Sequence, residues 1–165
     1  AGPYPLSHHG LGDVAVIIFF GIVPVTLTCY LQAGGWYGWQ ISLPASVAVG
    51  LMAANVLVVN NYRDMEDDAA VNKRTTVVIF GRKAMAWFYL MAGNLAMVVM
   101  IPVWKELSIW AALPLAVYLV LHLQTWRQMV RCRGAALNPV LGRTAKNLLV
   151  FSLLLIVAAG VSMVA

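Results

Sequence analysis

Long apolar runs alternate with short polar stretches along the chain, and their lengths predict helices that cross a membrane. A hydrocarbon core of roughly 30 Å requires about 20 apolar residues in an α-helix. Five runs reach or approach this length, at residues 14–31, 42–60, 84–103, 107–123 and 148–163. Because these runs are continuous, whereas barrel strands alternate over about ten residues, they favour helices. We therefore expect an all-α, polytopic transmembrane helical bundle.

Composition supports a membrane protein rather than a soluble one. Hydrophobic residues make up 62% of the 165 residues and charged residues only 10%, whereas soluble domains carry about 25% charged residues. The net charge of +5 is therefore better explained by charge asymmetry across a membrane than by nucleic-acid binding. No low-complexity linker or clear repeat divides the sequence, so residues 1–165 are expected to belong to one domain.

The basic residues predict how the bundle is oriented. Ten of the eleven lie in two polar stretches, after the second run and before the last: Arg63, Lys73, Arg74, Arg82, Lys83 and Arg127, Arg131, Arg133, Arg143, Lys146. Only Lys105 falls on the other side, which places both stretches in the cytoplasm by the positive-inside rule. An interfacial aromatic belt is expected at the opposite boundary, made by Trp36, Tyr37, Trp39, Trp104 and Trp110.

An acidic cluster follows the second run, within the stretch 60–75 that reads NNYRDMEDDAAVNKRT. It holds four of the six carboxylates of the chain, Asp64, Glu66, Asp67 and Asp68. Asp64 and Asp68 share one helix face if the preceding helix continues through them, with Asn60 one turn earlier. Carboxylate and amide oxygens are hard ligands that suit Mg²⁺. Glu66 and Asp67 are expected to face solvent.

Two cations follow the cluster, and together with a metal they indicate a diphosphate site. Lys73 and Arg74 could hold phosphate oxygens beside a metal bound at Asp64 and Asp68. Arg82 and Lys83 are expected to set topology and to contact anionic lipid instead. A single acidic cluster on five helices looks like half of a site, and the sequence begins with Ala1, so we expect part of a longer protein.

The stretch NNYRDMEDDAAVNKRT, followed by GRKAM and preceded by GPYPLSHHGLGD, resembles the UbiA superfamily of membrane prenyltransferases. Within it the pattern is most similar to the branch that prenylates 1,4-dihydroxy-2-naphthoate. This resemblance implies a nine-helix fold of which the chain looks like helices five to nine. It also implies an earlier aspartate motif upstream of Ala1. Asn72 stands where the family usually has glycine, and asparagine tolerates the left-handed backbone expected there.

The resemblance also implies the chemistry: transfer of a polyprenyl group from its diphosphate to the dihydroxynaphthoate ring, with loss of the ring carboxylate as CO₂, in a bacterial inner membrane. Asp64 and Asp68 would be the catalytic and metal-binding residues, holding Mg²⁺, and Arg63, Lys73 and Arg74 would bind the diphosphate. Asn60, Asn61 and Tyr62 would line the substrate pocket, although Tyr62 could instead be an interfacial anchor. The chain alone is expected to be inactive.

Three alternatives remain open from the sequence. The aromatic acceptor could be 4-hydroxybenzoate or homogentisate, because the pocket is shared with helices outside the chain. The chain could instead belong to a cation-coupled transporter, although such sites usually lie near the middle of the bilayer and these acids lie at the end of a run. A non-catalytic assembly module would leave the acidic cluster unexplained.

Overall fold

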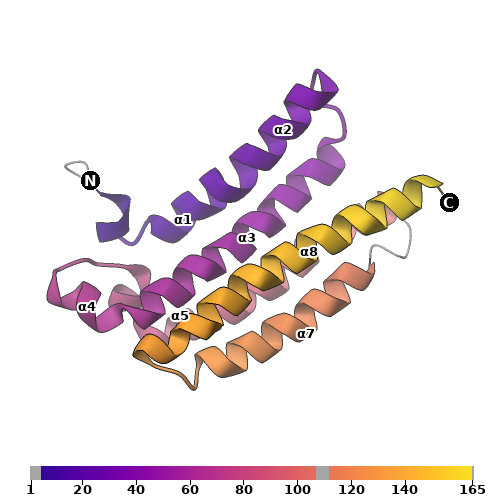
Figure 1. The fold of residues 1–165 in the computed structure, drawn as a ribbon. Helices are drawn as coiled ribbons and strands as arrows, with labels where there is room; N and C mark the ends of the chain where they lie inside the picture. Colours follow the sequence, from indigo (N-terminus) through magenta and orange to yellow (C-terminus); the bar gives the residue numbers. More distant parts are fainter. Residues whose placement is uncertain (1–4, 107–111, 165) are drawn as a thin grey trace.

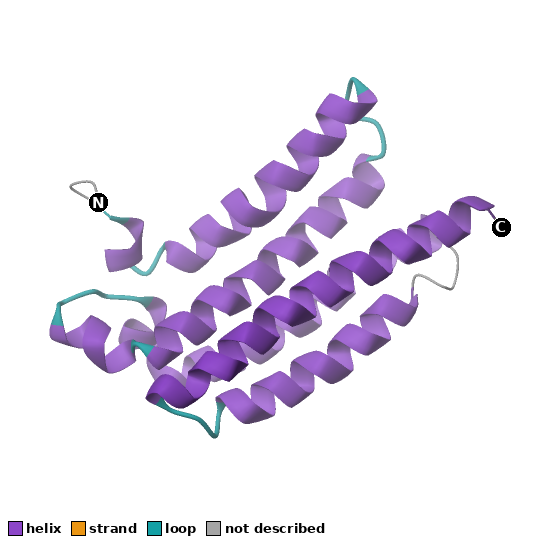
Figure 2. Ribbon diagram, in the orientation of Figure 1, coloured by secondary structure: helices purple, strands orange, loops and turns teal. Residues whose placement is uncertain are grey.

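The computed structural model describes residues 5–106 and 112–164, and within them it is helical without a strand (Figure 2). This confirms the all-α bundle. The described elements are η1 (Leu6–His8), α1 (Gly12–Val16), the π-helical segment η2 (Ile17–Ile22), α2 (Val23–Ala33), α3 (Trp39–Arg63), α4 (Met65–Ala70), α5 (Thr76–Val99), α6 (Ile101–Glu106), α7 (Ala112–Met129), η4 (Gly134–Leu137) and α8 (Asn138–Val164).

Four helical segments are long and apolar enough to span a membrane: Gly12–Ala33, Trp39–Arg63, Thr76–Val103 and Gly134–Ser162. The chain is therefore a multi-pass membrane protein. The remaining predicted run, 107–123, overlaps α7, and residues 107–111, with Trp110, lie outside the described part.

Two of the predicted helix starts are wrong. α5 begins at residue 76 and α8 at residue 138, eight and ten residues before the apolar runs that we expected to define them. Thr75 caps α5 by accepting a hydrogen bond from the backbone N–H of Val78 (3.4 Å). In α8 the early turns carry Arg143 and Lys146, which lower the local hydropathy but do not stop a helix. These two cations therefore lie on a helix and not in a loop.

α3 lies at the centre of the bundle and packs against η2, α2, α5 and α8. Figure 1 shows the α1–α2 rod on one flank of α3, and α8 beside it with α5 behind. The short α4 and the α7–α8 turn lie at one end of the bundle, and the turn between α2 and α3 lies at the other. Trp36 and Tyr37 in that second turn and Trp39 at the start of α3 have exposed rings, so three residues of the predicted aromatic belt lie together at this end of the bundle.

The first span crosses α3 at a glycine contact. A Cβ placed on Gly21 of η2 would lie 2.3 Å from the Cα of Gly50 in α3. The reverse change is excluded as well, because a Cβ on Gly50 would lie 2.7 Å from the carbonyl oxygen of Ile17. Small residues at such crossings let helix backbones approach closely in membranes, so this contact sets the spacing between the first span and α3.

An imidazole is buried between α5 and α7. His122 is 1% exposed and stacks between the rings of Tyr89 (4.8 Å between centroids) and Tyr118 (5.4 Å). Its Nε2 lies 3.2 Å from the carbonyl oxygen of Leu90. A Cβ on Gly93 would lie 2.3 Å from the same nitrogen, so the ring fills the space that this glycine leaves open.

Candidate functional site

The acidic cluster lies at a break between two helices, so α3 does not continue through it, which was the condition for Asp64 and Asp68 to share one face of that helix. α3 ends at Arg63, and Asp64 leaves helical geometry (φ −95°, ψ 12°) before α4 begins at Met65. The backbone N–H of Asp68 nevertheless donates to the carbonyl oxygen of Asp64 at 2.8 Å. One helical turn therefore still joins the two aspartates of the motif.

Arg63 organises the first aspartate. Its Nε and Nη2 donate to the two carboxylate oxygens of Asp64 at 2.6 and 2.7 Å. The same guanidinium reaches the side-chain oxygens of Asn60 (2.9 Å) and of Asn138 at the start of α8 (3.0 Å). These hydrogen bonds from Arg63 lower the pKa of the Asp64 carboxyl below its ordinary value. Asp64 is therefore held as an anion beside the end of α8.

Asp68 is held differently, with one oxygen paired and one left over. Its Oδ1 accepts a hydrogen bond from Lys73 Nζ at 3.0 Å, and its side chain is only 9% exposed. Its Oδ2 is buried and has no hydrogen-bond partner within the described part of the chain. Buried polar atoms are nearly always satisfied, so this oxygen is available to a ligand. The intervening Asn72 has φ 55°, which confirms the left-handed backbone expected there.

A polar chamber of about 90 Å³ opens beside these ion pairs. Three predicted site residues line it, Asn60, Asn61 and Lys73, and two others join them from elsewhere, Asp13 and Thr76. The hydroxyl of Thr76 donates to Asp13 Oδ2 at 2.6 Å. Asp13 is 5% exposed, and its Oδ1 has no hydrogen-bond partner among the described residues. The structure therefore places the Asp13 carboxylate in the chamber, whereas Asp64 and Asp68 do not line it and are linked to it through Lys73 and Asn60.

Asp13 is a chamber residue that was not predicted from the sequence, although a signal was present. A lone carboxylate in the first turn of a membrane-length helix is costly unless it has a partner or a function. Its partner lies 63 residues away in the chain, and no local pattern points to that pairing. The segment before α1 also contacts the loop after α4, where His9 and Arg74 form an isolated parallel bridge.

An apolar cavity of about 420 Å³ adjoins the polar chamber. It is lined by residues of α1, η2, α3 and α8: Val16, Phe20, Ala53, Val56, Leu57, Asn60, Leu141 and Leu148. Leu57 and Asn60 line both spaces. The site therefore has a polar part at one end of the bundle and an apolar part between the helices.

Tyr62 lies elsewhere. Its ring is 2% exposed and packs in a core cluster with Val58, Val59 and Val77. The guanidinium carbons of Arg82 and Arg133 lie 5.4 and 5.5 Å from the centre of the ring, and Arg133 donates to the Tyr62 hydroxyl at 3.4 Å. Tyr62 lines neither of the two cavities, so the geometry supports a packing role for this ring.

Two further charged residues lie at the surface beside the site. Arg74 is exposed, next to η1. Glu66 is also exposed and forms a bidentate ion pair with Arg82, with both contacts at 2.6 Å. These hydrogen bonds from Arg82 lower the pKa of Glu66 below its ordinary value. Glu66 therefore interacts with α5 and not with the chamber.

The carboxylates suit Mg²⁺ better than a metal ion that takes all of its ligands from the protein. No group of three or more His, Cys, Asp or Glu side chains that could hold a metal occurs within residues 5–106 and 112–164. Mg²⁺, however, is commonly bound by one or two carboxylates together with substrate phosphates. The buried, unpartnered oxygen of Asp68 and the anionic Asp64 one turn away are donors of that kind.

Comparison with known families decides the assignment. The model of the UbiA prenyltransferase family matches residues 3–143, which include the chamber and the aspartate pair. The chain belongs to the UbiA prenyltransferase family. This confirms the resemblance carried by the acidic stretch and its flanking segments.

Individual UbiA relatives have related names. The chain is 34% identical over 157 residues to the 1,4-dihydroxy-2-naphthoate octaprenyltransferase of Escherichia coli (strain K12), covering 94% of the chain and 50% of the relative. A protein of the same name from Mycobacterium tuberculosis is 35% identical over 92% of the chain and 51% of the relative. The 2-carboxy-1,4-naphthoquinone phytyltransferase of Synechocystis is 29% identical, over 82% and 47%. The chain thus spans about half the length of these relatives. No solved structure matches it.

Proposed function

We propose that this chain supplies half of an active site that transfers a polyprenyl group from its diphosphate to 1,4-dihydroxy-2-naphthoate. The observation that carries the proposal is that the polar chamber and the apolar cavity share two lining residues, Leu57 and Asn60, and so lie side by side. A polyprenyl diphosphate has the same polarity, with a charged head on a long apolar tail. The names of the relatives favour dihydroxynaphthoate over 4-hydroxybenzoate or homogentisate as the acceptor.

The diphosphate would lie at the polar end. Lys73 lines the chamber and is paired with only one oxygen of Asp68, so its ammonium can shift toward phosphate oxygens. Arg63 is adjacent, and the exposed Arg74 could reach the same group from outside. Cations positioned on a leaving diphosphate stabilise the charge that develops as the allylic C–O bond breaks.

Asp64 and Asp68 would hold Mg²⁺ on the diphosphate. When bound, the metal neutralises charge on the leaving group. For Asp64 to contribute an oxygen, Arg63 must release part of its two-point contact, and its existing hydrogen bonds to Asn60 and Asn138 would keep the guanidinium in place. Asp68 needs no such exchange, because its Oδ2 is already without a partner in the described structure.

The remaining residues would orient the acceptor and protect the reaction. The free oxygen of Asp13 can accept a hydrogen bond from a ring hydroxyl, while Thr76 holds the other oxygen in place. The apolar walls at Val56, Leu57 and Leu148 would hold the isoprenoid tail and exclude water, which would otherwise trap the allylic cation. The electron-rich ring then forms the new C–C bond, and the ring carboxylate leaves as CO₂.

The proposed setting is a bacterial inner membrane, with the polar end of the site in the cytoplasm. Ten of the eleven basic residues, by their places in the sequence, fall on the side of the aspartate pair, as the positive-inside rule requires. Cysteines introduced at positions 73 and 36 of the full-length protein test this orientation. On intact cells an impermeant thiol reagent should label position 36 and leave position 73 unlabelled, and the opposite result would reverse the topology.

The proposal is tested in the full-length protein, reconstituted in liposomes and supplied with octaprenyl diphosphate and dihydroxynaphthoate. Leu57→Trp should fill the junction of the two cavities and reduce turnover on the order of 100-fold, since small misplacements of reacting groups cost about that much. Leu95→Trp, at an exposed leucine of α5, is the matched control and should retain turnover. Chelation of Mg²⁺ should stop the reaction and its return should restore it. Equal activity of the two tryptophan variants would contradict the proposed substrate path.

A further inference from the structure

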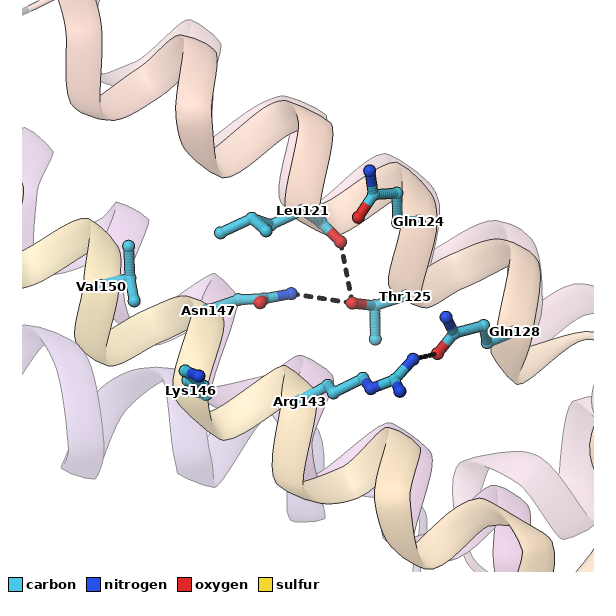
Figure 3. Close-up of a pocket in the computed structure, with 8 residues that line it drawn as sticks. All are labelled: Leu121, Gln124, Thr125, Gln128, Arg143, Lys146, Asn147 and Val150. Atoms are coloured by element: carbon cyan, nitrogen blue, oxygen red, sulfur yellow. Dashed lines mark hydrogen bonds between the residues drawn. The ribbon is translucent and has the colours of Figure 1, made fainter.

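A second polar pocket, of about 230 Å³, lies between α7 and α8 and takes no part in the proposed reaction (Figure 3). It is lined from α8 by Arg143, Lys146, Asn147 and Val150. These residues follow the i, i+3, i+4, i+7 spacing of one helix face. Leu141 and Leu148 of the same helix line the apolar cavity instead. With about 100° of rotation per residue, the two sets face in different directions, so this pocket opens away from the substrate path.

Neither cation of this pocket pairs with a carboxylate of the described residues. The ion pairs of the described residues join Arg63 to Asp64, Lys73 to Asp68 and Arg82 to Glu66, and none of them includes Arg143 or Lys146. Arg143 donates instead to the neutral side-chain oxygen of Gln128 on α7, as Figure 3 shows. The pocket therefore carries two positive charges without compensation, which suits an anionic ligand.

Hydrogen bonds join the polar side chains at the base of the pocket. Asn147 is buried, and its Nδ2 donates to the hydroxyl of Thr125 at 2.9 Å. That hydroxyl in turn donates to the carbonyl oxygen of Leu121 at 2.8 Å. These two hydrogen bonds join α8 to α7 beneath the pocket, while Arg143 reaches across to Gln128 and Lys146 lines the pocket from α8.

Polarity changes with depth along the pocket. Asn138 begins α8 and is bonded to Arg63 at the end of the bundle that holds the aspartate pair. Arg143 is five residues further on, or about 7.5 Å into the helix. Val150 and Leu121, which are apolar, line the deeper part. A ligand that fits this gradient has an anionic head at the membrane boundary and an apolar chain below it.

We propose that this pocket binds the phosphate group of an anionic phospholipid, with the phosphate between Arg143 and Lys146 and an acyl chain beside Leu121 and Val150. Basic pockets between membrane helices at a membrane boundary are suited to such headgroups. The apolar part of the pocket favours a lipid over free phosphate, because free phosphate has no apolar group to place there.

The test uses the full-length protein in a neutral detergent, with native mass spectrometry to count bound lipids and a thermal unfolding assay. Phosphatidylglycerol should bind in a saturable manner and raise the apparent Tm, whereas phosphatidylcholine should do neither. Lys146→Gln should weaken phosphatidylglycerol binding on the order of 10-fold, and Arg143→Gln with Lys146→Gln should weaken it further. Arg127→Gln with Arg131→Gln removes the same charge from exposed arginines outside the pocket and should leave the affinity unchanged.

Three results would overturn the proposal. Equal loss of affinity in the pocket pair and in the control pair would assign the effect to general charge. Stabilisation by inorganic phosphate to the same extent as by phosphatidylglycerol would make the ligand a free anion. Absence of any difference between phosphatidylglycerol and phosphatidylcholine would show that the pocket takes no anionic lipid. Because Lys146 is exposed, the single variant should fold even if the double variant does not.

Discussion

Two ion pairs on α4 use the same kinds of residues and lie two positions apart, yet their surroundings differ. Glu66 pairs with Arg82 through two contacts of 2.6 Å, and its side chain is 69% exposed. Asp68 pairs with Lys73 through one contact of 3.0 Å, and its side chain is 9% exposed. The carboxylate with the better contacts is the one that faces water, where ion pairs contribute little.

The difference teaches that burial and unused hydrogen-bonding capacity, rather than a short contact, indicate a functional carboxylate. Glu66 has both oxygens engaged by Arg82. Asp68 retains a buried oxygen without a partner in the described structure, beside a lysine that lines the chamber. The Glu66–Arg82 pair joins α4 to α5. Asp68 keeps one oxygen with which it can bind a ligand.

The largest effect is expected from Asp68→Asn in the full-length protein. The amide keeps the size of the carboxylate but lacks the charge that Mg²⁺ requires. Prenyl-transfer kcat should fall on the order of 100- to 1,000-fold, in the range seen for lost electrostatic stabilisation of a leaving group. Turnover is measured in liposomes over a series of Mg²⁺ concentrations. An unchanged apparent Tm would show that the protein still folds, and unchanged kcat would remove Asp68 from the metal site.

A smaller effect is expected from Lys73→Gln. The change removes a cation from the chamber but leaves the metal ligands in place, so kcat/KM for the prenyl diphosphate should fall roughly 10- to 100-fold. Lys83→Gln is the control, because it removes the same charge from an exposed residue of α5 that lines neither cavity. Comparable losses in the two variants would argue for a general effect of positive charge.

Asp13→Asn is expected to reduce kcat/KM for the aromatic acceptor by about 10-fold, the worth of one charge-assisted hydrogen bond. The asparagine can still accept from Thr76, so the packing around it should survive. Kinetics at a saturating concentration of one substrate and varied concentrations of the other separate the two binding steps. A loss confined to the prenyl diphosphate would contradict the role proposed for Asp13.

The smallest effect is expected from Glu66→Gln, which should change turnover less than about 3-fold because exposed ion pairs contribute little. The same assay that measures Asp68→Asn serves here, with both variants prepared in parallel. Equal losses at Glu66 and Asp68 would erase the distinction between the two pairs and leave an acidic surface loop in place of a site.

Much of the fold could be predicted because apolar runs have a length that a membrane dictates. The first two spans, expected at 14–31 and 42–60, lie within helical segments Gly12–Ala33 and Trp39–Arg63. The starts of α5 and α8 could not be predicted in this way, because Arg82 and Arg143 lower hydropathy without ending a helix. Hydropathy marks only the segments that lipid or core is expected to surround, and the first turns of α5 and α8 lie at the end of the bundle that holds α4 (Figure 1).

The site could be predicted only where its residues are neighbours in the chain. Asn60, Asn61 and Lys73 flank the acidic motif in the sequence, and all three line the chamber. Asp13 joins them through tertiary packing, from a segment 63 residues before its partner Thr76. Tyr62 shows the converse: it is adjacent to Asn61 in sequence, but the helix turns its ring about 100° away into the core.

The contact between Gly93 and His122 has a consequence for how this family can change. A methyl group at position 93 would lie 2.3 Å from the imidazole nitrogen, so the two positions are mutationally coupled. Gly93→Ala alone should be poorly tolerated, whereas the same change should cost far less in a His122→Ala background, where the ring is gone. A double-mutant cycle on the apparent Tm would reveal this as strong non-additivity. In descendants of this chain, alanine at position 93 is thus expected to spread only after position 122 has become small.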